Sequence, residues 1–445
     1  MGLRAALSRR LADWAARRPH LLLAAAPGAT AARLAVEAEA ARIGAVLSAT
    51  PADADLLVVA GDPGPELTEA VERVWGQLPG PRARVRVADP AQAGAALRGA
   101  LRALTAPEQA AEAAARKDGG DQAGNHEQHG TAADGHGERA DHQADRGDSS
   151  GGHGEPGADA GGDRGTAGGG QQGHGAGHEG HGGGGHQGHG GGMQMPGGLM
   201  MAERAEDRDG LKLDALHVPL GPVLPDWPAG LVVGLTVQGD LVQAATTHLL
   251  PPARPVSEPY WNGGAGMDSR CRQAAAHLDS LGRLLAVAGW PSAAGAARRL
   301  RDDLLADAPP PEVHERFRAL DRRFRRSRAL RWATDGLGVL SVEAAREAGV
   351  SGPAQRAIAD GGDATARWLR WLDEIAGLLA GAEPPAGEGP RGRWQPGRPP
   401  SRALLDVAAP LMVGIDVAAA RLVLASFDPD PDELTVAPAT TEDRG

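Results

Sequence analysis

Histidine is the residue type whose spacing in this sequence most clearly indicates chemistry. Ten of the 15 histidines lie between His126 and His189, and Met193 and Met195 follow them. The densest run, separated mostly by glycine, consists of His174, His178, His181, His186 and His189. Neutral imidazoles bind nickel, zinc and copper, and thioethers add affinity for Cu(I). The run therefore predicts nickel or zinc binding, and the alternative interpretation is a low-complexity spacer without a physiological metal role.

These histidines belong to a low-complexity segment, residues 106–200. Glycine supplies 31 of the 93 residues from Ala106 to Gly198, and the same stretch holds 14 acidic and 5 basic residues. No Leu, Ile, Val, Phe, Trp or Tyr occurs between Ala106 and Gly192. Because such a composition cannot bury enough apolar surface to offset the entropy of ordering, we predict a disordered His/Gly-rich linker between domains at 1–105 and 201–445.

Cysteine usage restricts the chemistry further. The chain has 1 cysteine, Cys271, which can form neither an internal disulfide nor a thiolate cluster site. We expect Cys271 to be a small, half-buried residue of a helix rather than a reactive thiol.

Composition also bears on partners and location. No basic patch with interleaved aromatic residues is apparent, which argues against nucleic-acid binding. The arginine-rich stretch 1–18 lacks the apolar core and cleavage site of a secretory signal, and the apolar run 21–26 is shorter than a bilayer span. We expect a cytoplasmic protein without a transmembrane segment, and the alternative is peripheral association with the cytoplasmic face of a membrane.

Residues 1–105 alternate short apolar runs with amphipathic stretches. Strands are predicted at 21–26, 55–61 and 85–87, and helices at 30–47, 65–78 and 92–104. Strands and helices that alternate across short loops are typical of a mostly parallel sheet. The first domain is therefore predicted to be α/β, flavodoxin-like in outline.

Residues 201–445 predict a mostly helical α+β domain. Alternating apolar residues at 231–237, a turn at Gly239–Asp240 and a return strand from Leu241 predict a β-hairpin. Ser341 is predicted to cap a helix that has Glu343 in its first turn, after an extended piece at 336–340. Other helices are predicted at 269–288, 292–306, 311–333, 363–380 and 414–424, with a Pro/Gly-rich loop at 384–400.

The first domain resembles a known family over roughly residues 20–104. An acidic residue followed by an apolar Val-Ala-Gly strand occupies 51–61, a helix follows, and Gln-Leu-Pro-Gly-Pro-Arg occupies 77–82. This order resembles the B subunit of NADH-quinone oxidoreductase (complex I) and the related small subunits of NiFe hydrogenases.

The last domain is similar to the D subunit of complex I, which is related to the hydrogenase large subunit. The resemblance covers about 210 residues in five ordered segments: 219–242, 338–353, 363–379, 388–392 and 426–429. The last two carry Glu-Gly-Pro-Arg-Gly and Ser-Phe-Asp-Pro. Together the two resemblances imply a fused, diverged pair of B-like and D-like subunits.

The resemblance also implies cofactor sites whose ligands are missing. The B-like family holds an iron–sulfur cluster on four cysteines, but the corresponding stretches 24–29 and 87–90 contain none. Asp430 and Glu433 stand where hydrogenases have their second pair of nickel-binding cysteines, and carboxylates are poor substitutes for thiolates. We expect no iron–sulfur cluster and no confidently assigned cofactor, apart from nickel or zinc on the linker.

A loop implied to contact quinone is also altered. Leu224 and Ala229 stand near the positions of the two histidines of this family's loop. The residues left as degenerate quinone-loop positions are Gly221, Pro222, Asp226 and Trp227. Trp227 is alternatively a packed loop anchor, and Tyr260 is either a pocket lip or part of a surface turn.

The leading interpretation is an atypical, cluster-less subunit of a complex I-like or hydrogenase-like assembly, acting as a structural or degenerate quinone-side module. Its partners would be the other subunits, with quinone as a further ligand, and no catalytic residue is assigned. One alternative is a nickel- or zinc-binding assembly or delivery protein that acts through its linker. The other is a quinone or NAD(P)H oxidoreductase subunit with an altered site.

Overall fold

The computed structural model describes residues 18–106, 203–206, 212–263, 267–395 and 397–436. The arginine-rich N-terminal stretch, the predicted linker and all five of its closely spaced histidines lie outside the described residues. The described parts before and after the linker belong to one compact unit.

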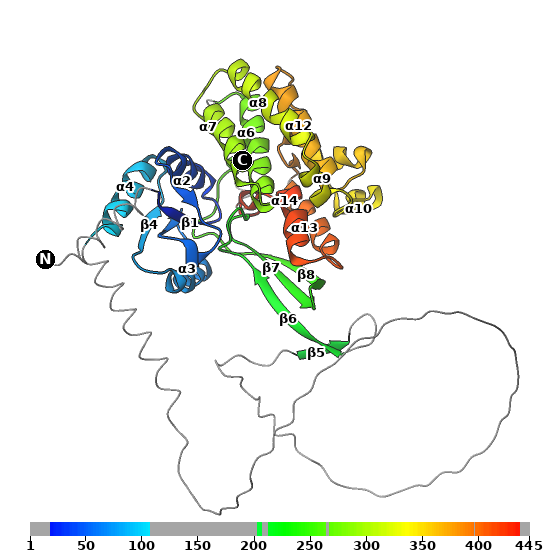
Figure 1. Cartoon of the computed structure of the whole chain (residues 1–445). Coiled ribbons are helices and arrows are strands. Elements are labelled where there is room, and N and C mark those ends of the chain that lie inside the picture. The colour runs from blue at the N-terminus through cyan, green and yellow to red at the C-terminus, as the bar shows by residue number, and fades with distance from the viewer. Residues whose placement is uncertain (1–17, 107–202, 207–211, 264–266, 396, 437–445) are drawn as a thin grey trace, which may run out of the picture. The chain divides into compact units, whose positions relative to one another are not determined.

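Residues 18–106 form an α/β region around a parallel sheet (Figure 1). The sheet has the order β2-β1-β3-β4, which agrees with the first four strands of a flavodoxin-like sheet. Its strands are β1 (His20–Ala25), β2 (Val46–Leu47), β3 (Leu56–Ala60) and β4 (Ala83–Val87). The helices are α2 (Thr30–Arg42), α3 (Pro65–Gln77) and α4 (Ala93–Leu104). The predicted α/β class with a parallel sheet is confirmed.

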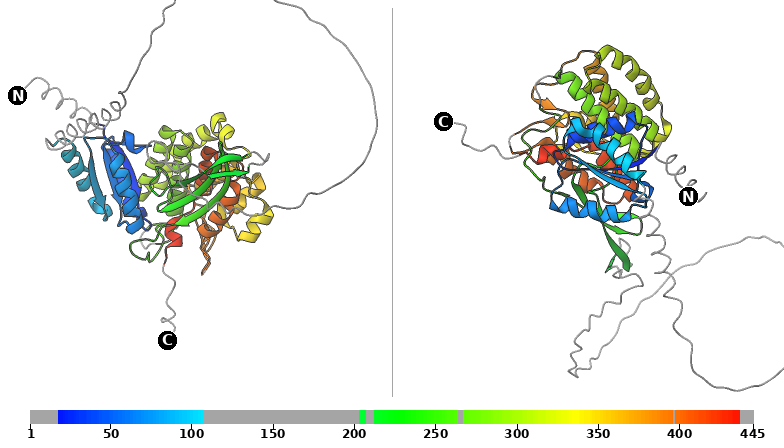
Figure 2. Two further views of the ribbon diagram at one scale, coloured as in Figure 1. Left: turned by 90° about the horizontal axis from the view of Figure 1, so that it is seen from below. Right: turned by 90° about the vertical axis from the view of Figure 1, so that its left-hand side faces the viewer.

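Helices cover both faces of this sheet (Figure 2). Leu57 and Val59 of β3 pack with Leu67 of α3. On the other face, Val58 packs with Val36 of α2 and with residues of α4. A central strand that is apolar on both sides is what a sheet buried between two helical layers requires.

One predicted element of this region is wrong. The helix expected to run to Leu47 ends at Arg42, because Gly44 adopts a left-handed conformation with φ +73°. The residues beyond it form the edge strand β2, which pairs with β1. The apolar spacing of Leu47 therefore belongs to a strand rather than to the helix.

The second region begins with an antiparallel sheet in the order β5-β6-β7-β8. Its strands are β5 (Glu203–Glu206), β6 (Lys212–Leu220), β7 (Leu231–Gln238) and β8 (Leu241–Leu249). The predicted hairpin is confirmed as β7 and β8, whereas β5 and β6 were not predicted. Alternate residues of β7, from Leu231 to Val237, are buried against the helices that follow.

Helices make up most of the second region (Figure 1). They are α6 (Ser269–Val287), α7 (Pro291–Leu305), α8 (Pro310–Arg325), α9 (Arg328–Thr334), α10 (Val342–Ala348), α11 (Gly352–Arg356), α12 (Ala364–Leu379), α13 (Pro400–Leu411), α14 (Val417–Phe427) and α15 (Pro431–Leu434). The short strands β9 (Glu388–Gly389) and β10 (Gly392–Arg393) pair with each other. The predicted cap at Ser341 is confirmed, since its hydroxyl accepts from the Ala344 N–H.

Four features of the second region differ from the prediction. The helix expected at 311–333 is two helices, because the Ser327 hydroxyl accepts from the Leu330 N–H and starts α9. Residues 336–338 are a turn rather than part of an extended piece, since Gly336 and Gly338 have positive φ, and residues 339–340 form no strand. Helix α13 begins at Pro400, directly after the predicted loop, and was missed. The last long helix, α14, lies a few residues later than the predicted 414–424.

Among the described helices, none has both the length and the apolar character needed to cross a bilayer.

Candidate functional site

The loop between β6 and β7, residues 221–230, contains the four residues that were predicted to be degenerate quinone-loop positions. The Trp227 indole N–H donates to the Leu231 carbonyl at 2.7 Å, and its side chain is buried. Gly221 has φ +93°, and a Cβ there would lie 2.2 Å from the Leu231 oxygen. Trp227 thus anchors the loop, and Gly221 lets the loop approach the strand.

The close approach of the loop to the strand at Gly221 can be tested by substitution. Gly221→Ala is expected to reduce the free energy of unfolding by about 1–3 kcal/mol, because alanine must both adopt a positive φ and clash with backbone. Gly239→Ala is the matched control, since Gly239 also has positive φ but has open space around it. Urea unfolding should show a clearly smaller loss of unfolding free energy for Gly239→Ala than for Gly221→Ala. Equal losses for the two variants would contradict the proposed clash.

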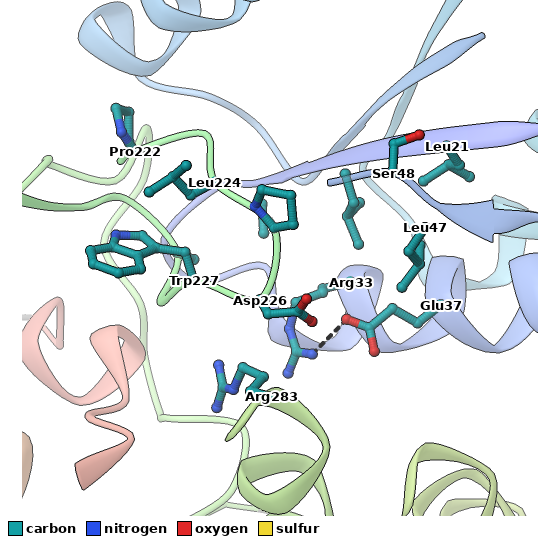
Figure 3. Close-up of a pocket in the computed structure, with 14 residues that line it drawn as sticks. Leu21, Arg33, Glu37, Leu47, Ser48, Pro222, Leu224, Asp226, Trp227 and Arg283 are labelled. Atoms are coloured by element: carbon teal, nitrogen blue, oxygen red, sulfur yellow. Dashed lines mark hydrogen bonds and ion pairs between the residues drawn. The ribbon is translucent and has the colours of Figure 1, made fainter. Parts of the chain in front are cut away.

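The loop closes one side of a cavity between it and the α/β sheet (Figure 3). The walls include Leu21 of β1, Ser48, Pro222, Asp226 and Trp227. Its volume is about 40 Å³, whereas a cavity of about 150 Å³ is the size that accepts a benzene ring. The cavity can hold a few water molecules, and in this conformation it does not accommodate a quinone ring.

Charged side chains form the floor of this cavity and continue beneath it. Arg33 of α2 donates to both carboxylate oxygens of Asp279 on α6, at 3.2 and 2.8 Å, and to Glu37 at 2.8 Å. Arg301 of α7 donates to the same two carboxylates, Glu37 at 2.8 Å and Asp279 at 2.6 Å. The dashed contact between Arg33 and Glu37 is visible in Figure 3.

We call this set the junction network. It contains the arginines Arg33, Arg283, Arg298 and Arg301 and the carboxylates Glu37, Asp226, Asp279 and Asp302. Two members, Arg33 and Glu37, come from the α/β region, and the others come from the second region. Arg301 is fully buried and Asp279 is 1% exposed. Buried charges of this kind are tolerated only when they are paired and hydrogen-bonded.

The pKa values follow from this pairing. Burial alone would raise the pKa of Glu37, but Arg33 and Arg301 lower it to about 2. Burial likewise opposes ionisation of Asp279, and its arginine partners hold its pKa well below the usual value. Asp226 differs, because burial outweighs Arg298 and raises its pKa. The centre of the network therefore stays ionised, whereas the carboxyl at the loop is the more easily protonated.

A second cluster joins the network through Arg283. Asp428 accepts from Arg283 at 2.9 Å and from the Ser280 hydroxyl at 2.5 Å. Arg391 also donates to the Asp428 carboxylate, and its Nε donates to the Asp428 carbonyl oxygen at 3.0 Å. Arg391 and Asp428 belong to two of the resemblance segments, 388–392 and 426–429, so these segments meet in a buried ion pair.

The turn after Asp428 contains Asp430 and Glu433, the carboxylates that stand where the resemblance implies the second pair of nickel-binding cysteines. Glu433 accepts from the backbone N–H and hydroxyl of Ser401, at 3.0 and 2.5 Å, and from Asn262 at 3.1 Å. Burial, followed by the charge of Asp432, raises the pKa of Asp430 to about 8. Burial also raises the pKa of Glu433. Within the part of the chain that is described, no three His, Cys, Asp or Glu residues are arranged to hold a metal ion.

The loop after β1, where the resemblance implies adjacent cluster cysteines, is filled by small apolar groups. Ala26 and Ala29 are buried, and a Cβ at Gly61 would lie 2.3 Å from the Ala29 methyl. The Gly28 N–H donates to Asp432 at 2.7 Å, which ties this loop to the C-terminal turn. Methyl groups and backbone stand where thiolates would be needed, so these residues do not fit an iron–sulfur cluster.

A larger cleft of about 750 Å³ lies away from the quinone-loop positions. Its walls include Trp261, Asn262, Arg272 and Trp394, together with residues 383–390. Tyr260 does not line it; instead its ring packs edge-on against Trp261, with centroids 4.9 Å apart. Cys271 is half-buried on α6, and burial raises the pKa of its thiol, as expected for a structural cysteine.

The structure brings the four predicted quinone-loop residues together with a network that the sequence analysis missed. A signal was present, because Arg33 and Glu37 lie four residues apart on the side of α2 that also carries Val36 and Ala40. Charged residues inside an apolar stripe indicate buried pairing. Their partner Asp279 is 246 residues away in sequence, so the pair itself could not be identified.

Comparison with known proteins gives limited information. No protein family and no curated protein matches the chain. Among solved structures, the chain is similar to one chain of the membrane-bound sulfane sulfur reductase, an archaeal respiratory membrane complex. The sequence identity is 16% and the TM-score 0.38, and the similarity covers 50% of this chain and 98% of that chain. At this level the likeness assigns no activity.

Proposed function

We propose that this chain is a structural subunit of a complex I-like respiratory assembly, in which a B-like and a D-like region are held together in one polypeptide. The observation that carries the proposal is the junction network. It fixes α2 of the first region against α6 and α7 of the second through buried charges. In the assemblies that the sequence resembles, these two parts are separate subunits.

We further propose that the chain carries no electron. The adjacent pair among the four cysteines of the B-like family would stand in the loop after β1, but this loop holds alanine, glycine and proline. These residues are packed against Asp432 and the β6–β7 loop. The cavity at the predicted quinone-loop positions, about 40 Å³, is far smaller than the cavity of about 150 Å³ that accepts a benzene ring. Both observations favour a scaffold over a redox-active subunit.

The test is a tagged pull-down from the native cell with identification of partners by mass spectrometry. The full-length chain is compared with a version that lacks residues 110–198. Recovery of other respiratory oxidoreductase subunits by both versions is expected. If only the full-length chain recovers partners, and these are metal-trafficking proteins, the function belongs to the histidine-rich segment instead.

A second measurement addresses electron transfer. The anaerobically purified full-length chain is expected to contain no stoichiometric iron or acid-labile sulfide and no absorbance typical of an iron–sulfur cluster. Stoichiometric iron and sulfide that survive gel filtration would overturn the proposal that the chain carries no electron. Because this readout concerns the chain alone, it is independent of which partners are recovered.

A further inference from the structure

Helices α8 and α9 carry an unusual concentration of arginine. From Arg316 to Arg331 there are eight arginines and one acidic residue, Asp321. The eight arginines divide into two groups: one makes ion-pair or aromatic-ring contacts with other described residues, and the other makes none.

The first group of arginines is used within the fold. Arg316 pairs with Asp303, and Arg325 pairs with Asp321 and Asp373, both at 2.6 Å. Arg323 lies over the Trp290 ring at 4.7 Å, and Arg331 lies over the Trp368 ring at 6.0 Å. These five contacts give four of the eight arginines a structural role.

The second group consists of Arg318, Arg322, Arg326 and Arg328. All four are exposed, and none forms an ion pair with another described residue. Arg318, Arg322 and Arg326 follow one another at four-residue steps, which places them on one side of α8 and its end, about 6 Å apart along the axis. The fold gives no reason for this row.

Trp332 lies on the same side of α9 as Arg328, one helical turn later. Its side chain is 88% exposed, whereas Trp227, Trp261, Trp368 and Trp371 are buried. A tryptophan left almost entirely in water exposes a large apolar surface that an amphipathic environment would cover. We call Arg318, Arg322, Arg326, Arg328 and Trp332 the α8–α9 arginine patch.

We propose that the α8–α9 arginine patch attaches the chain to an anionic membrane surface, with the arginines over the lipid phosphates and Trp332 in the head-group region. Tryptophan concentrates at membrane interfaces because its ring is apolar and its N–H polar. Basic side chains near an anionic leaflet each contribute binding energy, and this attraction acts over about one Debye length. The local patch therefore acts even though the whole chain has a net charge of -11.

Two other partners fit the patch less well. Single-stranded nucleic acid is bound through several aromatic stacking platforms, but the aromatic residues of α8, Phe317 and Phe324, are buried. The chain's own acidic stretch, residues 106–198, has only 14 acidic residues among 93, mixed with 5 basic ones. Neither partner would cover Trp332 as the membrane interface does.

The experiment is co-sedimentation of the full-length chain with vesicles of phosphatidylcholine containing roughly one-third phosphatidylglycerol. Binding is expected to these vesicles and not to pure phosphatidylcholine, and to weaken as salt is added. Replacing Arg318, Arg322 and Arg326 together with glutamine should reduce the partition coefficient roughly 100-fold, at roughly fivefold for each arginine. Trp332→Ser should weaken it severalfold.

The matched control replaces Arg73, Arg102 and Arg402 with glutamine. These residues are also exposed, form no ion pair with another described residue, and lie on α3, α4 and α13. The control has the same net charge as the patch variant, so vesicle binding should stay within about twofold of the original chain. Equal losses in the two variants would overturn the proposal.

Two further results would also overturn it. One is binding to pure phosphatidylcholine as tight as to the anionic vesicles. The other is tighter binding to a short single-stranded RNA that is lost in the patch variant, which would make the patch a nucleic-acid site. Because all five residues are exposed, the variants should keep the thermal unfolding midpoint of the original chain, and this is measured alongside.

Discussion

Asp279→Ala is expected to lower the free energy of unfolding by about 3–5 kcal/mol, the cost typical of removing one partner from a buried ion pair. The Asp279 carboxylate accepts from Arg33 and Arg301 and lies 3.3 Å from Arg283. Its loss leaves these buried guanidinium groups short of negative charge. Urea unfolding of the full-length chain measures the change, and the thermal midpoint should fall by roughly 10 °C.

An exposed pair is the control for this prediction. Arg84 and Glu72 approach to 2.5 Å, but their side chains are 38% and 53% exposed. Glu72→Ala should therefore change the free energy of unfolding by at most about 1 kcal/mol. A loss for Asp279→Ala as small as this would contradict the view that the junction network holds the two regions together.

A double-mutant cycle separates the junction contact from other effects. Arg33→Ala and Asp279→Ala each remove one side of a contact between the two regions. If Arg33 and Asp279 stabilise the protein through their contact with each other, the double variant should lose less unfolding free energy than the two single variants together. The expected coupling is on the order of 2 kcal/mol. Additive losses would show that Asp279 acts within its own region alone.

Helices and strands were predicted correctly where the spacing of apolar residues and the residue types at the ends of the element indicated the same structure. Strand β3 is a continuous apolar run, and α3 begins at Pro65, which suits the first turn of a helix. Errors arose where one residue overrode the pattern. Gly44 ended α2 before Leu47, and Ser327 separated α8 from α9.

Proline caused the clearest omission among the helices. Pro399 and Pro400 close a stretch that the composition marks as a loop, yet Pro400 is the first residue of α13. Because proline lacks an N–H, it breaks a helix interior but is well suited to the first turn. Composition alone could not show which of these two roles applied.

The candidate site was predictable only in part. The β6–β7 loop can be found from residues that are close in sequence, whereas the junction network depends on contacts between distant residues. Residues of the β6–β7 loop are close in sequence, so a motif could point to Gly221 and Trp227. The junction network joins α2 to α6 and α7 across most of the chain. Sequence shows that Arg33 lies on an apolar stripe, but only the tertiary structure shows which carboxylates face it.

Asp430→Asn is expected to make the stability of the protein less dependent on pH between about pH 5 and 8. In the folded chain, burial and then the charge of Asp432 raise the pKa of Asp430 to about 8, whereas an aspartate in an unfolded chain titrates near 3.9. Between these values the folded state binds one more proton than the unfolded state. The free energy of unfolding must then fall as pH rises.

The size of the effect follows from the same linkage. Each pH unit in this window should cost about 1.4 kcal/mol, so the original chain should lose about 3 kcal/mol between pH 5.5 and 7.5 through this one carboxyl. Asparagine cannot ionise, so the variant should lack this loss. Urea unfolding at several pH values gives the two slopes, and Asp240→Asn at the exposed hairpin turn controls for the loss of one negative charge.

The window also separates Asp430 from Glu37 of the junction network, because these two carboxyls respond to pH in opposite directions. The pKa of Glu37 is lowered to about 2, so the stability that Glu37 contributes is present above its unfolded pKa and is lost only as the solution becomes strongly acidic. A slope between pH 5.5 and 7.5 therefore cannot come from Glu37. Parallel profiles for the original chain and Asp430→Asn would mean that Asp430 is ionised in the folded protein, with Arg391 as the nearest source of compensating charge.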